Sequence, residues 1–277
     1  CPPWSIQSTK MLHDNKKKTI YYNNALLKIY NIPIFYIPKL SHPDPTVDRR
    51  SGFLPPSLYS SKNLGSGISL PYFFNLAPDK NFTLRSRLYV DEHPLFLGEY
   101  HQAFKNSNLI TDFGYTKGYK NVSNSKKAGE KSHFFSSFSK NFENDDGSDG
   151  SFSVIVQNTS NDKYLKLYRI NSNIVENSAG TLENSLSYNY QKDDFFLGFD
   201  VSAYETLKSD YNDKYEYILP RLTLDKNLFS NNEFGTLDLQ SNVKFHNYDT
   251  NKLSQFLVND LDWDFKEINF IYIHFSC

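Results

Sequence analysis

The sequence predicts an all-β protein in which a proline-rich junction separates two β-rich regions. Three observations lead to this fold class. Segments of alternating apolar and polar residues recur along the chain, Phe, Tyr and Trp make up 16% of it, and eight of its twelve prolines fall within residues 33–78. Aromatic residues favour pleated strands, whereas proline lacks a ladder donor and fixes φ. The junction therefore cannot be the middle of a regular sheet.

Four short strands are predicted before and into the start of the junction, at residues 4–12, 17–23, 25–31 and 33–37. Their apolar residues fall in places on both faces, which indicates a small sheet with an apolar interior. An ordinary soluble sandwich core has the same composition, so that alternative stays open.

Longer strands follow the junction. Residues 236–245 show the pattern most clearly, because Leu237, Leu239, Val243 and Phe245 alternate with polar residues at the period of a strand. We expect polar links at 119–131, 142–150 and 208–213, and tight turns at 75–81 and 91–94. About thirteen strands are predicted, at 67–76, 82–90, 95–105, 108–117, 132–142, 151–158, 163–171, 181–191, 194–205, 214–224, 236–245, 253–265 and 268–275.

This pattern favours a membrane β-barrel, whose strands need only about 9–11 residues with alternate ones apolar. The mean hydropathy of -0.58 is compatible with a barrel. No run approaches the roughly 18 apolar residues of a membrane helix, which excludes a helical membrane protein. A porin-like channel and a soluble β-sandwich binding module remain alternatives. Because bacterial barrels usually have an even number of strands, we expect this barrel to be incomplete and both chain ends to be cuts.

Chemistry-bearing residues give little sign of catalysis. The net charge of -1 provides no basic field for nucleic acid. Asp260, Asp262 and Asp264 share one strand face, which we expect to line a water-filled lumen opposite Arg or Lys. No motif indicates an enzyme, so no catalytic residue, metal or cofactor is expected. The histidines lack metal-ligand spacing and are expected to be solvated or lumen-facing: His13, His42, His93, His101, His133, His246 and His274.

Three motifs around the junction carry a resemblance to a known family. They read PIFYIPKL at 33–40, DPTVDRRSGFLPPS at 44–57 and GISLPYFFNLAPDKNFTL at 67–84. They resemble the lipopolysaccharide (LPS)-assembly outer-membrane protein family, LptD (also called OstA or Imp), over residues 4–90. Beyond residue 90 the resemblance is mainly one of strand pattern, with YILPRLTL at 217–224 and FLVNDLDWDF at 256–265 in keeping with it.

The resemblance implies an architecture and a function. Residues 1–48 would end a periplasmic β-jellyroll, 49–66 would be a hinge, and 67–277 would form the first part, about thirteen strands, of a large transmembrane barrel. Such a protein passes LPS from the jellyroll to a laterally opening barrel, for insertion into the outer leaflet of the outer membrane. The implied partners are LPS, an LptE-like plug lipoprotein, an LptA-like periplasmic bridge protein and the outer membrane.

The resemblance also implies three groups of site residues. The lateral gate would comprise Leu70, Pro71, Tyr72 and Ser86, with Pro71 weakening the seam because it lacks an N–H; Ser86 stands where the family usually has a second proline. A proline tolerated at a strand bend is the alternative for Pro71.

The hinge would comprise Arg49, Arg50, Ser51 and Gly52, with the arginines available to lipid phosphates and Gly52 giving backbone freedom. A solvated turn explains the hinge nearly as well. A greasy lipid track would comprise Ile20, Tyr22, Leu27, Ile29, Ile34 and Tyr36.

Overall fold

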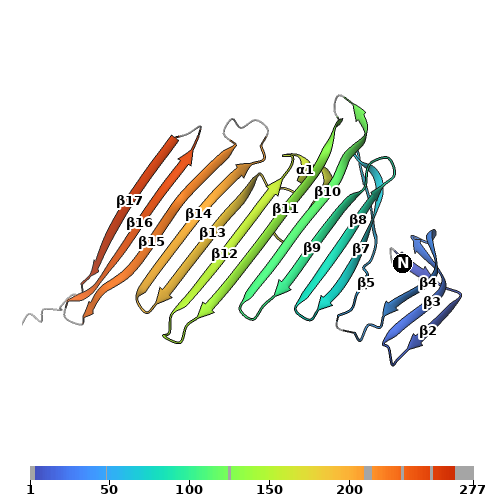
Figure 1. Ribbon diagram of the computed structural model, residues 1–277, viewed down its shortest axis with the longest axis horizontal. Coiled ribbons are helices and arrows are strands. Elements are labelled where there is room, and N and C mark those ends of the chain that lie inside the picture. The colour runs from blue at the N-terminus through green and yellow to red at the C-terminus, as the bar shows by residue number, and fades with distance from the viewer. Residues whose placement is uncertain are drawn as a thin grey trace, which may run out of the picture. The chain divides into compact units, whose positions relative to one another are not determined.

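The computed structural model describes residues 4–47, 49–123, 126–208, 214–231, 234–249 and 252–265. These residues form two antiparallel sheets and one short helix (Figure 1). The prediction of an all-β chain with about thirteen antiparallel strands after the small sheet is confirmed. No helix among the described residues has the length and apolar character needed to cross a membrane.

The first sheet is built on one long central strand. Its members are β1 (Trp4–Gln7), β2 (Lys10–Asp14), β3 (Thr19–Ile29) and β4 (Ile32–Pro43). β4 follows one edge of β3, and β1 and β2 share the other edge. Tyr30 and Asn31, with φ of 47° and 67°, form the two-residue turn between β3 and β4, as hairpins with two left-handed turn residues do. The two strands predicted at 17–23 and 25–31 are thus one strand, and the strand predicted at 4–12 is two.

The second sheet has thirteen strands, and from β7 onward each strand pairs with the next along the chain. β5 and β6 both pair with β7. β17 pairs only with β16 among the described residues, so the sheet is open at that edge. Its strands are β5 (Gly52–Phe53), β6 (Ser57–Ser61), β7 (Gly65–Ala77), β8 (Lys80–Tyr89), β9 (Leu95–Ala103), β10 (Ser107–Ser123), β11 (Lys126–Glu143), β12 (Asp149–Thr159), β13 (Thr181–Lys192), β14 (Phe195–Thr206), β15 (Tyr215–Asn231), β16 (Gly235–Tyr248) and β17 (Lys252–Asp264).

One of the predicted strands is a helix, and another lies where the structure gives no description. Residues 163–171 hold the helix α1 (Tyr164–Tyr168), not a strand, because Tyr164, Leu165 and Tyr168 recur at helical spacing and are all buried. The strand predicted at 268–275 lies outside the described residues. The sheet still has thirteen strands, because β5 and β6 form within the predicted hinge.

One predicted link is also wrong. Residues 119–131 were expected to be a polar loop, but on either side of residues 124 and 125 they extend β10 and β11. Polar composition misled the prediction here, because strand ends that run past an apolar band need no apolar face.

The apolar core lies around α1, at the end of the sheet where β12 ends and β13 begins (Figure 1). In β11 the buried residues Lys131, His133 and Phe135 alternate with Phe134, whose side chain is 47% exposed. The core side chains in and beside the helical connection are Tyr164, Leu165, Tyr168, Ile170, Val175, Leu182 and Leu207.

Candidate functional site

The predicted hinge residues form a clasp between the two sheets. Arg50 reaches the small sheet: its Nη1 donates to the carbonyl oxygens of Lys17 at 3.0 Å and Lys18 at 3.4 Å, and to Thr19 Oγ1. Three acceptors at one guanidinium nitrogen hold the turn before β3 in place.

Arg49 and Ser51 reach the large sheet instead. Arg49 Nη1 donates to Pro78 O at 2.7 Å, and the guanidinium carbon lies 5.9 Å from the centre of the Phe73 ring. Ser51 Oγ accepts a hydrogen bond of 2.8 Å from Asn75 N. The clasp (Arg49, Arg50 and Ser51) therefore joins the turn before β3 to the end of β7. Both arginines donate hydrogen bonds to backbone carbonyl oxygens.

Gly52 begins β5 and lies opposite Phe73 of β7. A Cβ added at Gly52 would meet only Pro43 Cδ, at 3.7 Å, which is ordinary van der Waals contact. The backbone freedom of glycine is thus not what this position requires.

The four predicted gate residues come together in the β7–β8 ladder. Leu70 lies opposite Ser86, Pro71 opposite Arg85 and Tyr72 opposite Leu84. Sequence spacing alone does not predict that Leu70 pairs with Ser86, because the register of the two strands depends on the turn that joins them.

The hydrogen bond of the Pro71 carbonyl group shows toward which edge of β7 the backbone groups of Pro71 point. Pro71 O accepts a hydrogen bond of 2.9 Å from Leu54 N, whereas Ser66 O accepts one of 3.1 Å from Val90 N, on the β8 side. In an antiparallel ladder the N–H and C=O of a residue point to the same edge. The N–H that Pro71 lacks would therefore point toward β5 and β6, and its absence leaves the β7–β8 ladder intact.

The six predicted lipid-track residues do not share one face of the small sheet. The register of β3 with β4 places Ile20, Tyr22 and Tyr36 on one face and Leu27 and Ile29 on the other. Ile34 lies at the register shift of β4, where it opposes no β3 residue.

The face that carries Leu27 holds an apolar patch that sequence reasoning missed. Its members alternate along β3 and β4 and are completed by β1, where Trp4 lies opposite Ile29 and Ile6 opposite Leu27. We call it the Leu27 patch; it comprises Trp4, Ile6, Ala25, Leu27, Ile29, Phe35 and Ile37. The cross-strand register, which follows from the turns, is the signal that identifies it.

A buried hydrogen-bond chain on the large sheet was also missed. His133 Nε2 lies 2.9 Å from Asp112 Oδ1, and Nδ1 lies 3.2 Å from Tyr164 Oη. The imidazole stacks on Phe135 at 4.6 Å between ring centres. His133 is not solvated, because the connection carrying α1 covers it. These hydrogen bonds connect α1 to β10 and β11.

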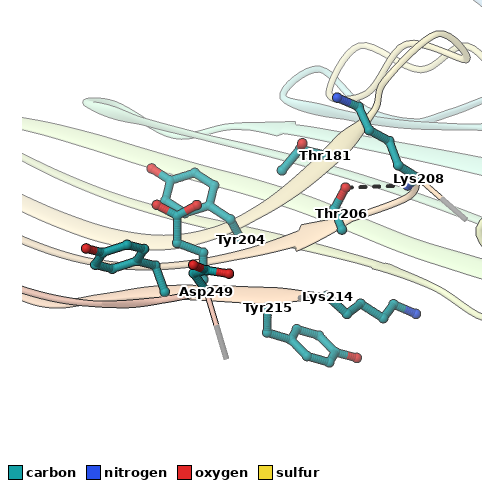
Figure 2. A pocket seen from close by; sticks show the side chains of 9 residues that line it. Thr181, Tyr204, Thr206, Lys208, Lys214, Tyr215 and Asp249 are labelled. Carbon is teal, nitrogen blue, oxygen red and sulfur yellow. Dashed lines mark hydrogen bonds between the residues drawn. The ribbon is translucent and has the colours of Figure 1, made fainter. Parts of the chain in front are cut away.

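A polar crevice of about 270 Å³ lies among the ends of β13–β16. Figure 2 shows Tyr204, Tyr215 and Lys214 around it. Lys214 Nζ contacts Glu205 Oε1 at 2.9 Å and Asp162 Oδ1 at 3.1 Å, and these carboxylates raise the pKa of Lys214. Its charge is thus already compensated, and the crevice has the chemistry of a solvated rim.

Two further carboxylates at this rim are paired as well. Glu216 Oε1 lies 2.5 Å from His246 Nε2, and Asp249 pairs with Lys252. Ion pairs of this kind at exposed positions contribute little to stability and leave few charges for a ligand.

The aspartates of β17 have one described neighbouring strand, β16. Asp260 lies opposite Gln240, Asp262 opposite Asp238 and Asp264 opposite Thr236, so no Arg or Lys of β16 lies directly opposite them. Among the described residues, no group of three or more His, Cys, Asp and Glu side chains is arranged to hold a metal ion.

Comparisons with known proteins relate part of this chain to one group of proteins. The described residues place this chain in the class of proteins with a long, open antiparallel sheet whose successive strands are neighbours. No protein-family model matches the sequence. The chain is 37% identical over 98 residues to the LPS-assembly protein LptD of Nitrosococcus oceani, and 42% identical over 85 residues to that of Francisella tularensis subsp. novicida. These matches cover 35% and 30% of this chain, but only 13% and 9% of the relatives.

A third relative gives the same picture. The LptD of Legionella pneumophila strain Paris is 35% identical over 97 residues, which is 11% of its length. Over about a third of its length the chain is therefore LptD-like. The solved structure of Pseudomonas aeruginosa OccK1 matches 94% of the chain and 64% of its own, at 10% identity and a TM-score of 0.31, too low to support an argument.

Proposed function

We propose that this chain is part of an LPS-assembly protein, in which lipid passes from the small sheet to an outer-membrane barrel that opens sideways. The similarity to LptD relatives supports the proposal, as does the large number of apolar side chains that the large sheet exposes. The single observation that carries it is the clasp, because it ties a sheet with an apolar patch to the first strands of an open sheet.

The proposed division of the chain follows from this role. Residues 1–48 end a periplasmic jellyroll, residues 49–66 form the junction, and residues 67–277 begin the barrel. The N-terminal part then lies in the periplasm and the strands lie in the outer membrane. An LptA-like bridge protein would deliver lipid to the small sheet, and an LptE-like lipoprotein would fill the barrel.

We assign the lipid track to the Leu27 patch rather than to all six predicted residues. Acyl chains gain free energy from apolar surface at about 25 cal/mol per Å², so a patch on one face binds them better than residues divided between two. Leu27 and Ile29 belong to the patch, whereas Ile20, Tyr22 and Tyr36 lie on the other face.

The test uses the full-length protein in the host that makes it. A photo-crosslinking amino acid at Leu27 should form adducts with LPS, and the same amino acid at Tyr22, on the opposite face, should form at least tenfold fewer. Depletion of the protein should lower the LPS at the cell surface. Unchanged surface LPS, together with ion conductance of the purified protein in bilayers, would refute the proposal in favour of a channel.

A further inference from the structure

A proline lies inside β15, in the part of the large sheet that β15, β16 and β17 form (Figure 1). The register of β15 with β16 shifts at Leu219 and Pro220, which together face the single residue Phe245. The register of β15 with β14 shifts at the same two residues, opposite Val201. Proline within a sheet is accommodated at such a bulge, where two residues oppose one and the strand bends. The bulge thus interrupts both ladders of β15 without ending the sheet.

An apolar groove of about 320 Å³ lies beside the bulge, across β15, β16 and β17. It is lined by Tyr217, Leu219, Phe245, Asn247 and Leu253. Four of these five side chains are large and aliphatic or aromatic, and they are between 36% and 61% exposed. The groove is therefore apolar and open to its surroundings.

The face of the sheet that holds the groove carries further apolar side chains. Tyr217 lies opposite Asn247, and on the same face, beyond the bulge, Leu222 lies opposite Val243. Val243 in turn lies opposite Leu257 of β17. In the proposed barrel this face contacts lipid, so the groove is a hollow in the lipid-facing surface.

The groove lies near one end of its strands. Successive strands alternate in direction, so the starts of β15 and β17 and the end of β16 lie at the end of the sheet away from the turn between β7 and β8. That turn contains Pro78, whose carbonyl oxygen accepts the hydrogen bond from Arg49 of the clasp. Tyr217 is the third residue of β15, and Leu253 is the second of β17. With the small sheet in the periplasm, as proposed, the groove lies at the outer end of the strands.

The groove is more polar toward the outer end than toward the middle of the strands. The hydroxyl of Tyr217 and the amide of Asn247 belong to opposed residues at the outer side, and the Tyr215 ring stacks on that of Tyr217 at 6.4 Å between centres. Leu219 and Phe245 lie further in along the same strands. Tyrosines at such a place keep a polar tip in the interface and an apolar ring against hydrocarbon. The groove therefore suits an amphipathic molecule whose head group lies at the outer end.

We infer that this groove binds an acyl chain of an LPS molecule in the outer leaflet, so that β15–β17 carry a lipid site of their own. The inference rests on the proposed function, because that function places this face in the membrane and this end of the strands at the cell surface. A chain lying in the groove contacts side chains of three strands at once, whereas a chain against a flat wall contacts fewer atoms. LPS held here exchanges more slowly than the lipid around it.

The test uses the full-length protein from the host that makes it, with a photo-crosslinking amino acid at Leu219, in the groove, or at Leu222, on the same face outside it. Each protein is irradiated in its native membrane and again after extensive washing with detergent, which removes loosely held lipid. LPS adducts are measured by immunoblot. We expect similar adducts at both positions in the membrane, and at least tenfold more at Leu219 than at Leu222 after washing.

A pair of matched variants tests whether the groove itself retains the lipid. Leu253→Trp places a larger ring in the groove, whereas Leu257→Trp adds the same ring on the same face of β17 outside it. Leu253→Trp should lower the retained adducts at Leu219 at least tenfold, and Leu257→Trp should leave them within twofold. The comparison of Leu219 with Leu222 needs neither variant, so it decides the matter even if Leu253→Trp fails to fold.

Equal loss of adducts at Leu219 and Leu222 on washing would overturn the groove site, because LPS would then be only part of the surrounding leaflet. Retained adducts that contain phospholipid in place of LPS, or retention that a folded Leu253→Trp protein leaves unchanged, would overturn it too. No LPS adducts at either position in the native membrane would instead refute the placement of this face in the outer leaflet, and with it the proposed function.

Discussion

The two faces of the large sheet use apolar side chains in opposite ways. In β11 the successive residues His133, Phe134 and Phe135 are 4%, 47% and 0% exposed. On the face that α1 covers, a histidine and an aspartate are buried with Tyr164, while the other face presents phenylalanine outward. In a soluble protein a large apolar side chain is more often buried, as Phe135 is, than left open as Phe134 is.

The exposed face suits the hydrocarbon surroundings that we propose for this sheet. A large apolar side chain costs little when it faces hydrocarbon, and polar groups are stable on the covered face because they bond to one another. The pattern continues on β15, where Leu222, which is 37% exposed, lies between Phe199 and Val243 of the adjacent strands. Its neighbour Thr223, on the other face, donates to Asn242 Oδ1 at 3.0 Å.

The largest expected effect comes from removing the cover of the buried face. Tyr164→Ala deletes a ring with no exposed surface, which should lower the free energy of unfolding by about 3–5 kcal/mol, as for other large aromatic side chains. Tyr164→Phe, the control, keeps the ring but loses the hydroxyl that bonds to His133, and should cost about 0.5–1.5 kcal/mol. Urea unfolding of the full-length protein in bilayers measures both. Equal losses would mean that packing against α1 contributes nothing.

A charge on the exposed face should have the next largest effect. Leu222→Arg should destabilise the inserted protein by about 2–4 kcal/mol, the range for arginine at the centre of the lipid face of a barrel. Thr223→Arg, one residue further on, points to the other face and should be nearly neutral. The same bilayer unfolding assay compares the two variants. A larger loss of stability for Thr223→Arg than for Leu222→Arg would mean that the face of Thr223, and not that of Leu222, contacts lipid.

The buried hydrogen-bonded pair of His133 and Asp112 gives a smaller contrast. His133→Ala leaves Asp112, which is 5% exposed, without its imidazole partner and should cost about 1–3 kcal/mol. Because the two groups interact, adding Asp112→Ala should cost less than the sum of the single changes. A double-mutant cycle measures the difference, and strict additivity would rule out the hydrogen-bond chain.

The smallest effect is expected just after β4, at the carboxylate of Asp44, which is 8% exposed. Hydrogen bonds from the Thr46 backbone N–H and hydroxyl, with His13 beside them, lower the pKa of Asp44 below its usual 3.8. A carboxyl group with a lowered folded-state pKa stabilises the fold above its ordinary pKa, and this contribution is lost as pH falls through the lowered value. As the pH falls below about 4, the thermal unfolding temperature of the native protein should therefore fall more than that of Asp44→Asn. Parallel curves for the two proteins would contradict this.

The sequence predicts those elements whose local pattern and tertiary setting agree. Residues 236–245 alternate cleanly, and β16 and β17 indeed present Leu239, Val243, Leu257 and Leu261 on one face. The pattern at 163–171 was misread as a strand, although Tyr164 and Tyr168 are one helical turn apart.

The candidate site was less accessible, because its geometry depends on register. The motif RRSG indicates a junction, yet no local signal shows that Arg50 serves the small sheet and Arg49 the large one. β6 reads as a Ser- and Pro-flanked loop, and only its pairing with β7 makes it a strand. Long-range pairing, not propensity, determines such edges.

The short β6 edge also has a consequence for how the sheet grows during assembly. Exposed strand edges recruit other chains, and proteins blunt them with short strands and prolines. Here the N-terminal edge is blunted in this way, while β17 offers thirteen residues without a partner among the described ones. Among the described residues, the edge at β17 is therefore better suited to recruit a further strand than the edge at β6.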